Sequence, residues 1–510
     1  MNRDKKDSFL FVFVVLLSIC FLYCSFANLE SMAVNNWDEA RHGISAYEMI
    51  QRNNWIENTF NYEKDVWNLK PPLSFWMEAV SMKIFGFNTF AARFPSAIAF
   101  TIMFFGICVF LKRNYGLLST LTFMLLFCAF DDFFFWHLGR RADADALYDL
   151  FFAYSFIFLH SYGTKKKKHY LYLSLLFAAF AFLTKSFHAI VIYLLIIVYI
   201  AIIGEWKKIS FIEFVGAVIC AFGPVIVWVL LRYHYDGTEF LTSMFSTDVT
   251  ERVNRADKDV FDYIKWICNI LFSWVPRAYL LLLGSSTFVV LFEAKDKKLS
   301  RAGGEQQKHI IWLWVVSCII LFGVYAIAFS RFNWYFYPFL ILLCMLTSIV
   351  FQEAVKTCKY IFNKKRKLFS IVCVAAMMIW ITCFGYSALN VFRNLRRASA
   401  PETEQSEIAL KTLVGRDSIY SGKNSYIVKP ETEYGLDNEW EQADILVAEL
   451  YNDFHCKNGG VEAFLTENQA VLILPKSIYS EYVELEQSSE IIAANDTYMA
   501  LGRVSKGTEE

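Results

Sequence analysis

The sequence has little charge and no excess of either sign. Only 19% of its 510 residues are Asp, Glu, Lys or Arg, and 49 basic side chains match 49 acidic ones. A nucleic-acid partner that binds a basic surface is therefore excluded, and any electrostatic function must be local. A disordered chain is excluded as well, because 56% of the residues are hydrophobic and 18% are aromatic.

Closely spaced cysteine pairs are also missing. Most of the 12 cysteines stand singly inside apolar runs, where cysteine behaves as a small hydrophobic residue. We therefore predict neither a disulfide framework nor a structural zinc site. His455 and Cys456 are adjacent, but no further motif accompanies them, which favours surface or packing residues over a reactive pair.

Long apolar runs recur along most of the chain. An α-helix rises about 1.5 Å per residue, so about 20 apolar residues cross the ~30 Å hydrocarbon core of a membrane. We predict an α-helical polytopic membrane protein with about eleven transmembrane helices. The first run exceeds the roughly 7–15 apolar residues of a signal peptide core, so we expect it to remain as an anchor. The expected helices are 9–27, 92–111, 116–135, 144–160, 170–183, 187–203, 211–231, 279–292, 310–329, 334–351 and 368–389.

The segment 71–86 decides the topology. It is apolar but short, and it contains Glu78 and Lys83. If it lies along the membrane surface as a juxtamembrane helix, the basic clusters fall on the side of the basic N-terminus, as the positive-inside rule requires. We therefore expect a cytoplasmic N-terminus, a first outer loop at 28–91 and a second large outer loop at 232–277. The clusters are Lys112-Arg113, 165–168, Lys207-Lys208, 295–298 and 364–367.

The composition becomes polar after residue 392, with many Glu, Asn and Ser. We predict a transmembrane domain over 1–392 and a soluble outer-face domain over 393–510. Short apolar stretches alternate with helical segments in the second domain, which favours a small α/β fold. Nothing in it resembles a phosphate-binding loop, and we expect no catalytic role for it.

Charged residues follow the first membrane run directly. Asp38, Glu39 and Arg41 stand there, and Asp38 is either a helix cap or a base aimed at a substrate in the membrane plane. Lys70 precedes two prolines, which fix an extended turn. This lysine either binds a lipid phosphate or extends its ammonium group to the interface.

A second charged group stands at the outer end of a later membrane run, at Arg141, Asp143 and Asp145. An ionised carboxylate at headgroup depth is costly, so Asp145 marks either a functional site or an ion pair with Arg141 one turn away. Two further outer turns carry Lys185 and Arg331. Carboxylates and cations on one face suit a reaction that deprotonates a nucleophile and stabilises a departing phosphate.

Several histidines also lie near the predicted outer face. A divalent metal is therefore an open alternative, although no closely spaced histidine pair supports a metal site. The histidines are His42, His137, His188 and His234.

Six motifs follow one another along the chain. They are Asp38-Glu39-Ala40-Arg41, Trp67-Asn68-x-Lys70-Pro71-Pro72-Leu73, Ala92-Arg93-Phe94-Pro95-Ser96-Ala97, Asp143-x-Asp145-Ala146-Leu147, Phe182-Leu183-Thr184-Lys185-Ser186 and Trp334-Tyr335-x-Tyr337-Pro338. In this order and spacing, over residues 35–351, the sequence resembles the GT-C membrane glycosyltransferases related to the protein O-mannosyltransferases and to the transferase that adds aminoarabinose to lipid A.

The resemblance implies a membrane-embedded transferase that moves one sugar from a polyprenyl-phosphate carrier, such as undecaprenyl phosphate, to an acceptor. The implied acceptor is lipid A, a protein or another envelope glycan at the outer face of the bacterial inner membrane. Acceptor choice is expected to lie in the loop 232–277 and in the C-terminal domain.

The resemblance also implies roles for individual residues. Asp38 corresponds to the catalytic base. The further catalytic acids that the resemblance implies are Glu39 beside it and, in the second outer turn, Asp143 and Asp145. Leu69 replaces an acid of the aminoarabinose transferases, so the metal site, donor and acceptor of that branch are not carried over. The implied contacts to the donor phosphate are Lys70, Arg41, Arg141, Lys185 and Arg331.

The expected reaction is a single displacement with inversion at the anomeric carbon. One base and several cations suffice, because a phosphate leaving group needs no strong general acid. A transporter or flippase is the main alternative, but charges near the membrane midplane and symmetric broken helices are not evident. A glycan-binding subunit without catalytic activity also stays open.

Overall fold

The computed structural model describes residues 3–247, 260–271, 273–294, 305–327, 332–400, 403–432 and 435–503. Contacts divide the chain into two compact units. The helical unit comprises Met1–Ala27, Ser96–Arg140 and Ala144–Ser399, and the mixed unit comprises Asn28–Pro95, Arg141–Asp143 and Ala400–Glu510. Arg331 and the basic cluster 295–298 lie outside the described residues.

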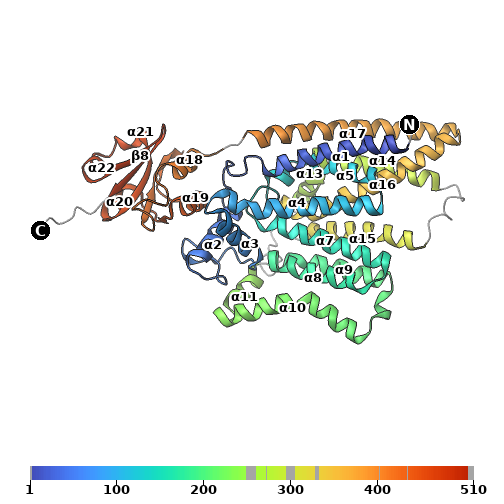
Figure 1. The fold of residues 1–510 in the computed structure, drawn as a ribbon, viewed down its shortest axis with the longest axis horizontal. Coiled ribbons are helices and arrows are strands. Elements are labelled where there is room, and N and C mark those ends of the chain that lie inside the picture. The colour runs from blue at the N-terminus through green and yellow to red at the C-terminus, as the bar shows by residue number, and fades with distance from the viewer. Residues whose placement is uncertain are drawn as a thin grey trace. The chain divides into compact units, whose positions relative to one another are not determined.

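The helical unit is built from long helices that pack side by side (Figure 1). In one group, α1 (Arg3–Phe26) packs on α5 (Leu117–Cys128), and α14 (Trp274–Ala294) packs on α16 (Tyr337–Asn363) and α17 (Lys367–Ser399). In another group, α7 (Ala144–Lys165) packs on α8 (Lys168–Lys185), which also contacts α10 (Phe211–Asp236). The remaining helices include α4 (Thr89–Asn114), α6 (Asp132–Phe135), α9 (Ile190–Ile202), α11 (Glu239–Phe245), α13 (Val260–Leu271) and α15 (Glu305–Ile327).

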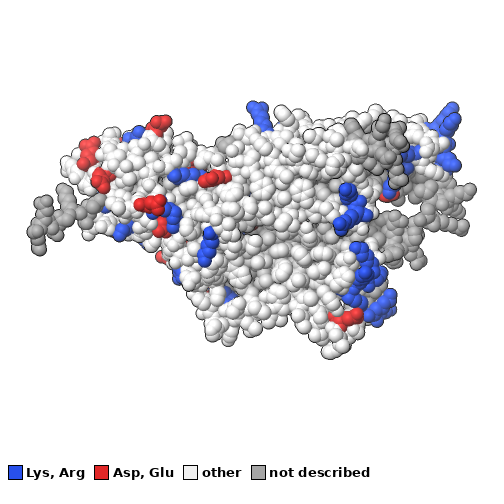
Figure 2. Space-filling view, viewed as in Figure 1, with Lys and Arg blue, Asp and Glu red and all other residues white. Residues whose placement is uncertain are grey.

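Five helical stretches among the described residues have the length and composition to cross a membrane. They are Thr89–Asn114, Lys168–Ile202, Phe211–Asp236, Asn333–Asn363 and Lys367–Ser399, and shorter apolar helices cover Leu10–Phe26, Leu117–Cys128, Pro276–Leu291 and Leu313–Tyr325. The expected number of about eleven spans stays a prediction. Figure 2 shows basic side chains gathered at one end of the helical unit, beside a broad face with few charged side chains.

One of the expected helices is divided in the structure, and one expected break between helices is present. The run 116–135 forms α5 only as far as Cys128, and α6 follows after a turn, because the adjacent Asp131 and Asp132 interrupt the apolar run and aspartate is a poor residue for a helix interior. The break expected between 183 and 187 is present as a short 3-10 helix, Ser186–Ala189.

The segment 71–86 forms one short helix in the mixed unit, α3 (Leu73–Phe85, 13 residues). The helix begins directly after the proline pair and ends at Gly86, whose φ of +85° suits glycine. Its length of roughly 20 Å is less than the ~30 Å hydrocarbon core. The helix is therefore too short to span a membrane by itself, and its place along the membrane surface stays a prediction.

The C-terminal part of the mixed unit contains a five-stranded sheet in the order β6-β3-β7-β9-β8. β3 (Asn424–Ile427) lies parallel to β6 (His455–Cys456) and β7 (Ala470–Pro475), whereas β9 (Tyr498–Arg503) is antiparallel to β7 and to β8 (Glu490–Ala494). β4 (Lys429–Thr432) and β5 (Gly435–Asp437) form a separate antiparallel pair. The helices of this part are α18 (Gln405–Thr412), α19 (Gln442–Asn452), α20 (Gly460–Thr466), α21 (Lys476–Tyr479) and α22 (Val483–Ser488). A small β-containing region is therefore present at the C-terminus, as predicted.

The first outer loop belongs to the same unit as this sheet. It contains α2 (Asp38–Gln51), α3 and the short strands β1 (Thr59–Phe60) and β2 (Glu63–Lys64). α2 packs along α19 in one apolar core, and a Cβ on Gly43 would lie only 2.7 Å from Cδ2 of Leu446. Glycine therefore allows the two helices to approach closely. The domain boundary expected after residue 392 stays a prediction, and α17 continues to Ser399.

Two carboxyl groups are buried near the contact between α2 and α19. Glu48 and Glu449 have no exposed surface. Burial raises the pKa of Glu48 to about 7, although Arg52 favours its charged form. Burial and the neighbouring Glu48 raise the pKa of Glu449 well above its ordinary value. The pair is therefore not fully ionised near neutral pH.

Replacing Glu48 by glutamine is expected to make unfolding less sensitive to pH. The folded pKa of Glu48 lies above the unfolded value of about 4.3, so its contribution to stability is present at low pH and is lost as the pH rises towards 7. Glutamine keeps the acceptor for the Tyr62 N–H, which donates to Oε1 of Glu48 at 2.7 Å. We expect Glu48→Gln to raise the unfolding temperature in detergent by roughly 3–8 °C at pH 8 and by less than half as much at pH 5.

The control is Glu63→Gln, because Glu63 is exposed on β2. An equal shift for Glu48→Gln at both pH values would contradict the assignment of a protonated, buried Glu48.

Candidate active site

Asp38, Lys70 and Asp143 meet in the mixed unit. The ammonium nitrogen of Lys70 donates to Oδ1 of Asp38 at 3.1 Å and lies 3.6 Å from Oδ1 of Asp143. The Asp38 side chain is 38% exposed, that of Lys70 20% and that of Asp143 only 1%. One partly exposed carboxylate and one buried carboxylate therefore share a cation.

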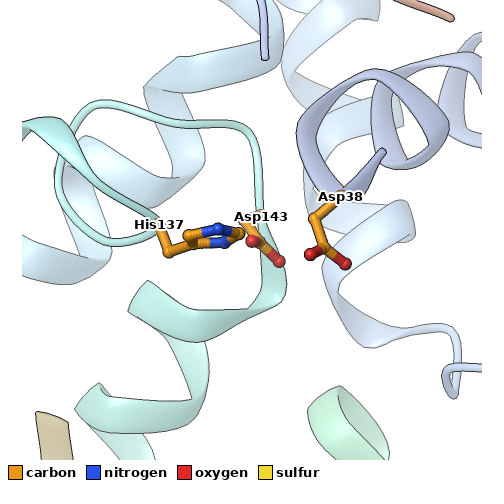
Figure 3. A group of neighbouring side chains, drawn as sticks. All are labelled: Asp38, His137 and Asp143. Atoms are coloured by element: carbon orange, nitrogen blue, oxygen red, sulfur yellow. The ribbon is translucent and has the colours of Figure 1, made fainter. Parts of the chain in front are cut away.

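The two aspartates come from distant parts of the sequence. Asp38 is the first residue of α2, and Asp143 stands one residue before α7. Figure 3 shows their carboxylates turned towards one another, and a pair of their oxygens lies within 4.8 Å. His137, also drawn there, belongs to the helical unit, where its ring stacks on Trp334 with centroids 3.7 Å apart.

Glu39, next to Asp38, is held in a buried ion-pair network. Nε of Arg93 donates to its Oε1 at 2.6 Å, and Nη1 of Arg141 donates to its Oε2 at 3.0 Å. The backbone N–H groups of Asn35 and Ala142 also donate to this carboxylate, at 2.8 and 3.2 Å. The carboxylate of Glu39 thus binds the first loop, the start of α4 and the segment before α7.

Arg93 extends this network into the backbone. Its guanidinium donates to three carbonyls of the loop before α2, those of Leu29, Met32 and Ala33, at 2.8–3.1 Å. Its side chain is 1% exposed. A planar guanidinium with five donors can satisfy a carboxylate and several carbonyls at once.

Burial alone would disfavour a charged Glu39, but its two arginines outweigh that cost. Arg93 and Arg141 lower the pKa of Glu39 to about 2. An acid that is ionised at all physiological pH values and surrounded by donors is a poor proton acceptor. The geometry therefore favours an anchoring role for Glu39 and leaves Asp38 as the accessible carboxylate.

Arg41 holds the loop that presents Lys70. It makes two hydrogen bonds to Asp65, at 2.7 and 3.2 Å, and its guanidinium carbon lies 4.1 Å from the centre of the Phe60 ring. Oδ1 of Asp65 accepts the backbone N–H groups of Trp67 and Asn68. Arg41 therefore acts on Lys70 through the loop.

A second set of polar contacts fixes the same loop. The side chain of Asn58 donates to the carbonyls of Asn68 and Lys70, at 2.8 and 3.1 Å. His42 is buried, with Nε2 at 2.8 Å from Oγ of Ser74 and Nδ1 at 3.3 Å from the amide nitrogen of Asn68. Both ring nitrogens of His42 are therefore engaged in contacts that orient the loop, which argues against a metal at this histidine.

The helical unit contains a separate acid–cation pair. Lys185 at the end of α8 forms a buried ion pair with Asp145 in the first turn of α7. The ammonium group of Lys185 also lies 4.8 Å from the centre of the Tyr335 ring. The pairing of Arg141 with Glu39 and of Asp145 with Lys185 differs from the local Arg141–Asp145 pair that the spacing left open.

Two buried acids near these groups received no role in the sequence analysis. Asp149 follows Asp145 by one helical turn, and among the described residues neither of its carboxyl oxygens has a hydrogen-bond partner. Glu78 on α3 is 2% exposed, and burial together with Asp143 and Glu39 raises its pKa well above the ordinary value. The i, i+4 spacing of the two aspartates was a usable signal for Asp149. For Glu78, the only indication in the sequence was that an acid stands within an apolar helix.

Asp38 and Asp143 are the candidate ligands for a metal ion at this site. Asp38 and Asp143 are oxygen ligands of the kind that divalent cations prefer, but the Lys70 ammonium already lies close to both. A divalent cation bound by these two carboxylates would have to displace that ammonium group. His188 uses Nδ1 in a contact with the carbonyl of Lys185, at 3.1 Å.

Residues 69–229 match the sequence profile of a family described as dolichyl-phosphate-mannose-protein mannosyltransferase. An uncharacterized protein of Aquifex aeolicus is 25% identical over 292 residues, which are 56% of this chain and 54% of its own. The undecaprenyl phosphate-alpha-4-amino-4-deoxy-L-arabinose arabinosyl transferase of Shewanella sediminis is 30% identical over 171 residues, 32% of this chain and 30% of its own. The matched regions thus span about half or less of these relatives.

The fold is similar to that of ArnT from Cupriavidus metallidurans, solved bound to undecaprenyl phosphate. The TM-score is 0.63 at 13% identity, and the alignment covers 98% of each chain. The prediction of a helical GT-C membrane fold with a small C-terminal β-containing region is confirmed, as is the resemblance to the GT-C glycosyltransferases. The chain is an integral membrane protein.

Loss of the charge on Glu39 is expected to destabilise the mixed unit strongly. Removing one partner of a buried ion pair leaves uncompensated charge, at a cost of about 3–5 kcal/mol. We expect Glu39→Gln to lower the unfolding temperature in detergent by roughly 10 °C. In the double variant Glu39→Gln, Arg93→Met, the unfolding temperature should fall by less than the sum of the decreases in the two single variants.

Glu353→Gln provides the matched control. Glu353 pairs with Lys356 at 2.7 Å, but both side chains are about half exposed, at 45% and 60%. Exposed ion pairs contribute at most about 1 kcal/mol to stability. If Glu39→Gln lowers the unfolding temperature no more than Glu353→Gln does, the anchoring role of Glu39 is wrong.

Proposed function

We propose that the protein is a glycosyltransferase that moves one sugar from a polyprenyl-phosphate donor to an acceptor at the outer face of the membrane. The main observation in support is that Asp38, Lys70 and Asp143 lie together, so that a partly exposed base stands beside a cation. The motifs of these residues lie in a chain with the fold of ArnT, and that protein was solved with undecaprenyl phosphate.

The relatives support the class of donor. One is described as an arabinosyl transferase that uses an undecaprenyl-phosphate sugar, and the family profile is described by a dolichyl-phosphate mannose transfer. Both donors join a sugar to a polyprenyl phosphate. We therefore propose a hexosyl or pentosyl donor of this type, with lipid A, a protein or another envelope glycan as the acceptor.

Asp38 is the proposed base. Its carboxylate accepts the proton of the acceptor hydroxyl as that oxygen attacks the anomeric carbon. The bond from the anomeric carbon to the phosphate oxygen breaks on the opposite side, so the configuration inverts. The electron pair of that bond leaves with polyprenyl phosphate.

Lys70 is the proposed contact to the departing phosphate. Its ammonium group stabilises the charge that develops on the leaving oxygen. An anionic donor competes with Asp38 for this ammonium group, and loss of the ion pair raises the basicity of Asp38. Donor binding would in this way prepare the base.

The contacts divide the other proposed residues into two groups. Glu39, Arg41 and Arg141 hold backbone segments in place, so we propose that they position Asp38, Lys70 and Asp143. Asp143, whose carboxylate lies 3.6 Å from the Lys70 nitrogen, helps to hold that ammonium group beside Asp38. Lys185 with Asp145, and Arg331, remain proposed contacts for the donor phosphate or its neighbours.

We propose that the protein resides in a bacterial inner membrane with the N-terminus in the cytoplasm. The basic clusters Lys112-Arg113, 165–168, Lys207-Lys208 and 364–367 are largely exposed and support this orientation through the positive-inside rule. The first outer loop and the C-terminal region would then face the periplasm. None of the reported relatives is described as a transporter, which was the alternative function.

Replacing Asp38 by asparagine should abolish transfer. Purified protein in lipid vesicles would be supplied with a panel of radiolabelled undecaprenyl-phosphate sugars and with envelope extract, and label would be followed into lipid and protein fractions. We expect a fall of 10²–10⁴-fold in rate, because a positioned base contributes about that much. Asp131→Asn is the control, since Asp131 is a surface acid that is 50% exposed.

Transfer by Asp38→Asn at the rate of the wild type would refute the role of Asp38. Movement of intact labelled lipid between leaflets without any transfer would support the flippase instead.

Replacing Lys70 should weaken both donor binding and the chemical step. We expect Lys70→Ala to raise the donor KM and to lower kcat by roughly 10²-fold, whereas Lys70→Arg should retain part of the activity because it keeps the positive charge. The same vesicle assay with varied donor concentration measures both constants. Lys83→Ala is the control, since Lys83 on α3 lies over the Trp55 ring. Unchanged kinetics for Lys70→Ala would remove the lysine from the proposed site.

A further inference from the structure

The residue before Asp38 has an unfavourable backbone conformation. Trp37 has φ 67° and ψ −106°, a region that bulky residues rarely adopt. It occupies the position before the first helical residue of α2, and no side-chain cap is formed there. Such strain persists only where the surrounding structure imposes it, and it occurs preferentially at functional sites.

The beginning of α19 imposes this conformation. The backbone N–H of Trp37 donates to Oε1 of Gln442 at 2.8 Å. The side chain of Asn36 donates to Oε2 of Glu441 at 3.0 Å and accepts the backbone N–H of Ala443 at 2.9 Å. Three consecutive residues of the C-terminal region therefore hold the two residues that precede Asp38.

The holding residues are themselves fixed. The ammonium group of Lys429 lies 3.3 Å from Oε1 of Glu441 and 2.5 Å from Oδ2 of Asp444. The hydrogen bond from Asn36 and the charge of Lys429 lower the pKa of Glu441. Further back in the loop, the backbone N–H of Val34 donates to Oε1 of the buried Glu407 at 2.7 Å.

We propose that Gln442, supported by Glu441, is a positioning residue for the transfer reaction: it fixes the backbone of Trp37 and thereby aims the carboxylate of Asp38. The inference rests on the proposed function of Asp38. It gives the C-terminal region a role in catalysis, where the sequence analysis expected none. The α/β region would hold the backbone before Asp38 in position through these hydrogen bonds, whereas Asp38 and Lys70 would contact the substrates.

The size of the effect follows from the distances involved. The carboxylate of Asp38 lies one residue from the Trp37 amide, so a change in the Trp37 torsions moves it relative to Lys70. A displacement of about 1 Å in a reacting group can lower the rate by up to 10²-fold. Donor binding depends on Lys70, whose loop is held by Arg41 and Asn58 and makes no use of Gln442 in the contacts described above.

The test compares two variants of Gln442 in the vesicle assay. Gln442→Leu removes the acceptor of the Trp37 N–H, and we expect kcat to fall roughly tenfold while the donor KM stays within about twofold. Gln442→Glu keeps an acceptor oxygen and is expected to retain at least half of the wild-type kcat. A merely structural role would instead lower the yield and unfolding temperature, and leave kcat per folded molecule unchanged.

Tyr451→Phe is the matched control. Tyr451 lies in the last turn of the same helix, and its hydroxyl donates to Oε1 of Glu30 at 2.8 Å and accepts the Thr89 N–H at 3.2 Å. It therefore joins α19 to the first loop at a place other than Asn36 and Trp37. We expect wild-type kcat for this variant.

Hydrogen exchange gives a second readout that needs no substrate. Without substrate, the peptide that covers residues 34–44 should exchange several-fold faster in Gln442→Leu than in the wild type. In Tyr451→Phe its exchange rate should equal that of the wild type. Faster exchange with lowered kcat and restored kcat in Gln442→Glu would support the proposal. Unchanged exchange, or wild-type kcat in Gln442→Leu, would overturn it.

The two proposals fail in different ways. If the wild type transfers no sugar from any donor of the panel, the proposed function is refuted, while the exchange experiment still decides whether Gln442 fixes Trp37. If the wild type transfers, Asp38→Asn does not, and Gln442→Leu matches the wild type, only the positioning role is refuted.

Discussion

The buried carboxylate of Glu39 is the interaction on which the candidate site depends. It is bound by Arg93 at the start of α4 and by Arg141 in the segment before α7, so one side chain ties three distant stretches of chain together. A charge buried this deeply is tolerated only when its partners remain in place. The positions of Asp38, which precedes it, and of Asp143, which follows Arg141, are therefore set by the same network.

Adjacent acids receive different roles from their surroundings. Asp38 and Glu39 are neighbours in sequence, yet the first side chain is 38% exposed and the second 3%. Glu39 is held ionised by two arginines, whereas Asp38 shares the ammonium group of Lys70 with Asp143. A residue that anchors the fold, such as Glu39, must keep its ion-pair partners, whereas a base such as Asp38 must release its partner to accept a proton. The difference in burial therefore distinguishes the two roles better than residue type does.

The sequence predicted the features that depend on composition and local pattern. The long helices, the short α3 after its prolines and the C-terminal α/β region follow from apolar run length and turn residues. The partners of individual charges could not be predicted, because the contact of Glu39 with Arg93 joins residues far apart in sequence. Arg93 stood in a recognised motif without a role, and Glu39 was grouped with the catalytic acids. The site roles themselves stay predictions, and Arg331 lies outside the described residues.

The start of α2 shows why such contacts are hard to read from sequence. A helix usually begins at Ser, Thr, Asp or Asn, whose side chain satisfies the first free N–H groups locally. Here the position is occupied by Trp37 without a side-chain cap, and Gln442, about four hundred residues later, accepts its N–H. The first turn of α2 therefore depends on a residue far away in the sequence. The backbone before Asp38 is held in place only where the C-terminal region packs against the first loop, so a change at the start of α19 can alter the site without touching any of its charged residues.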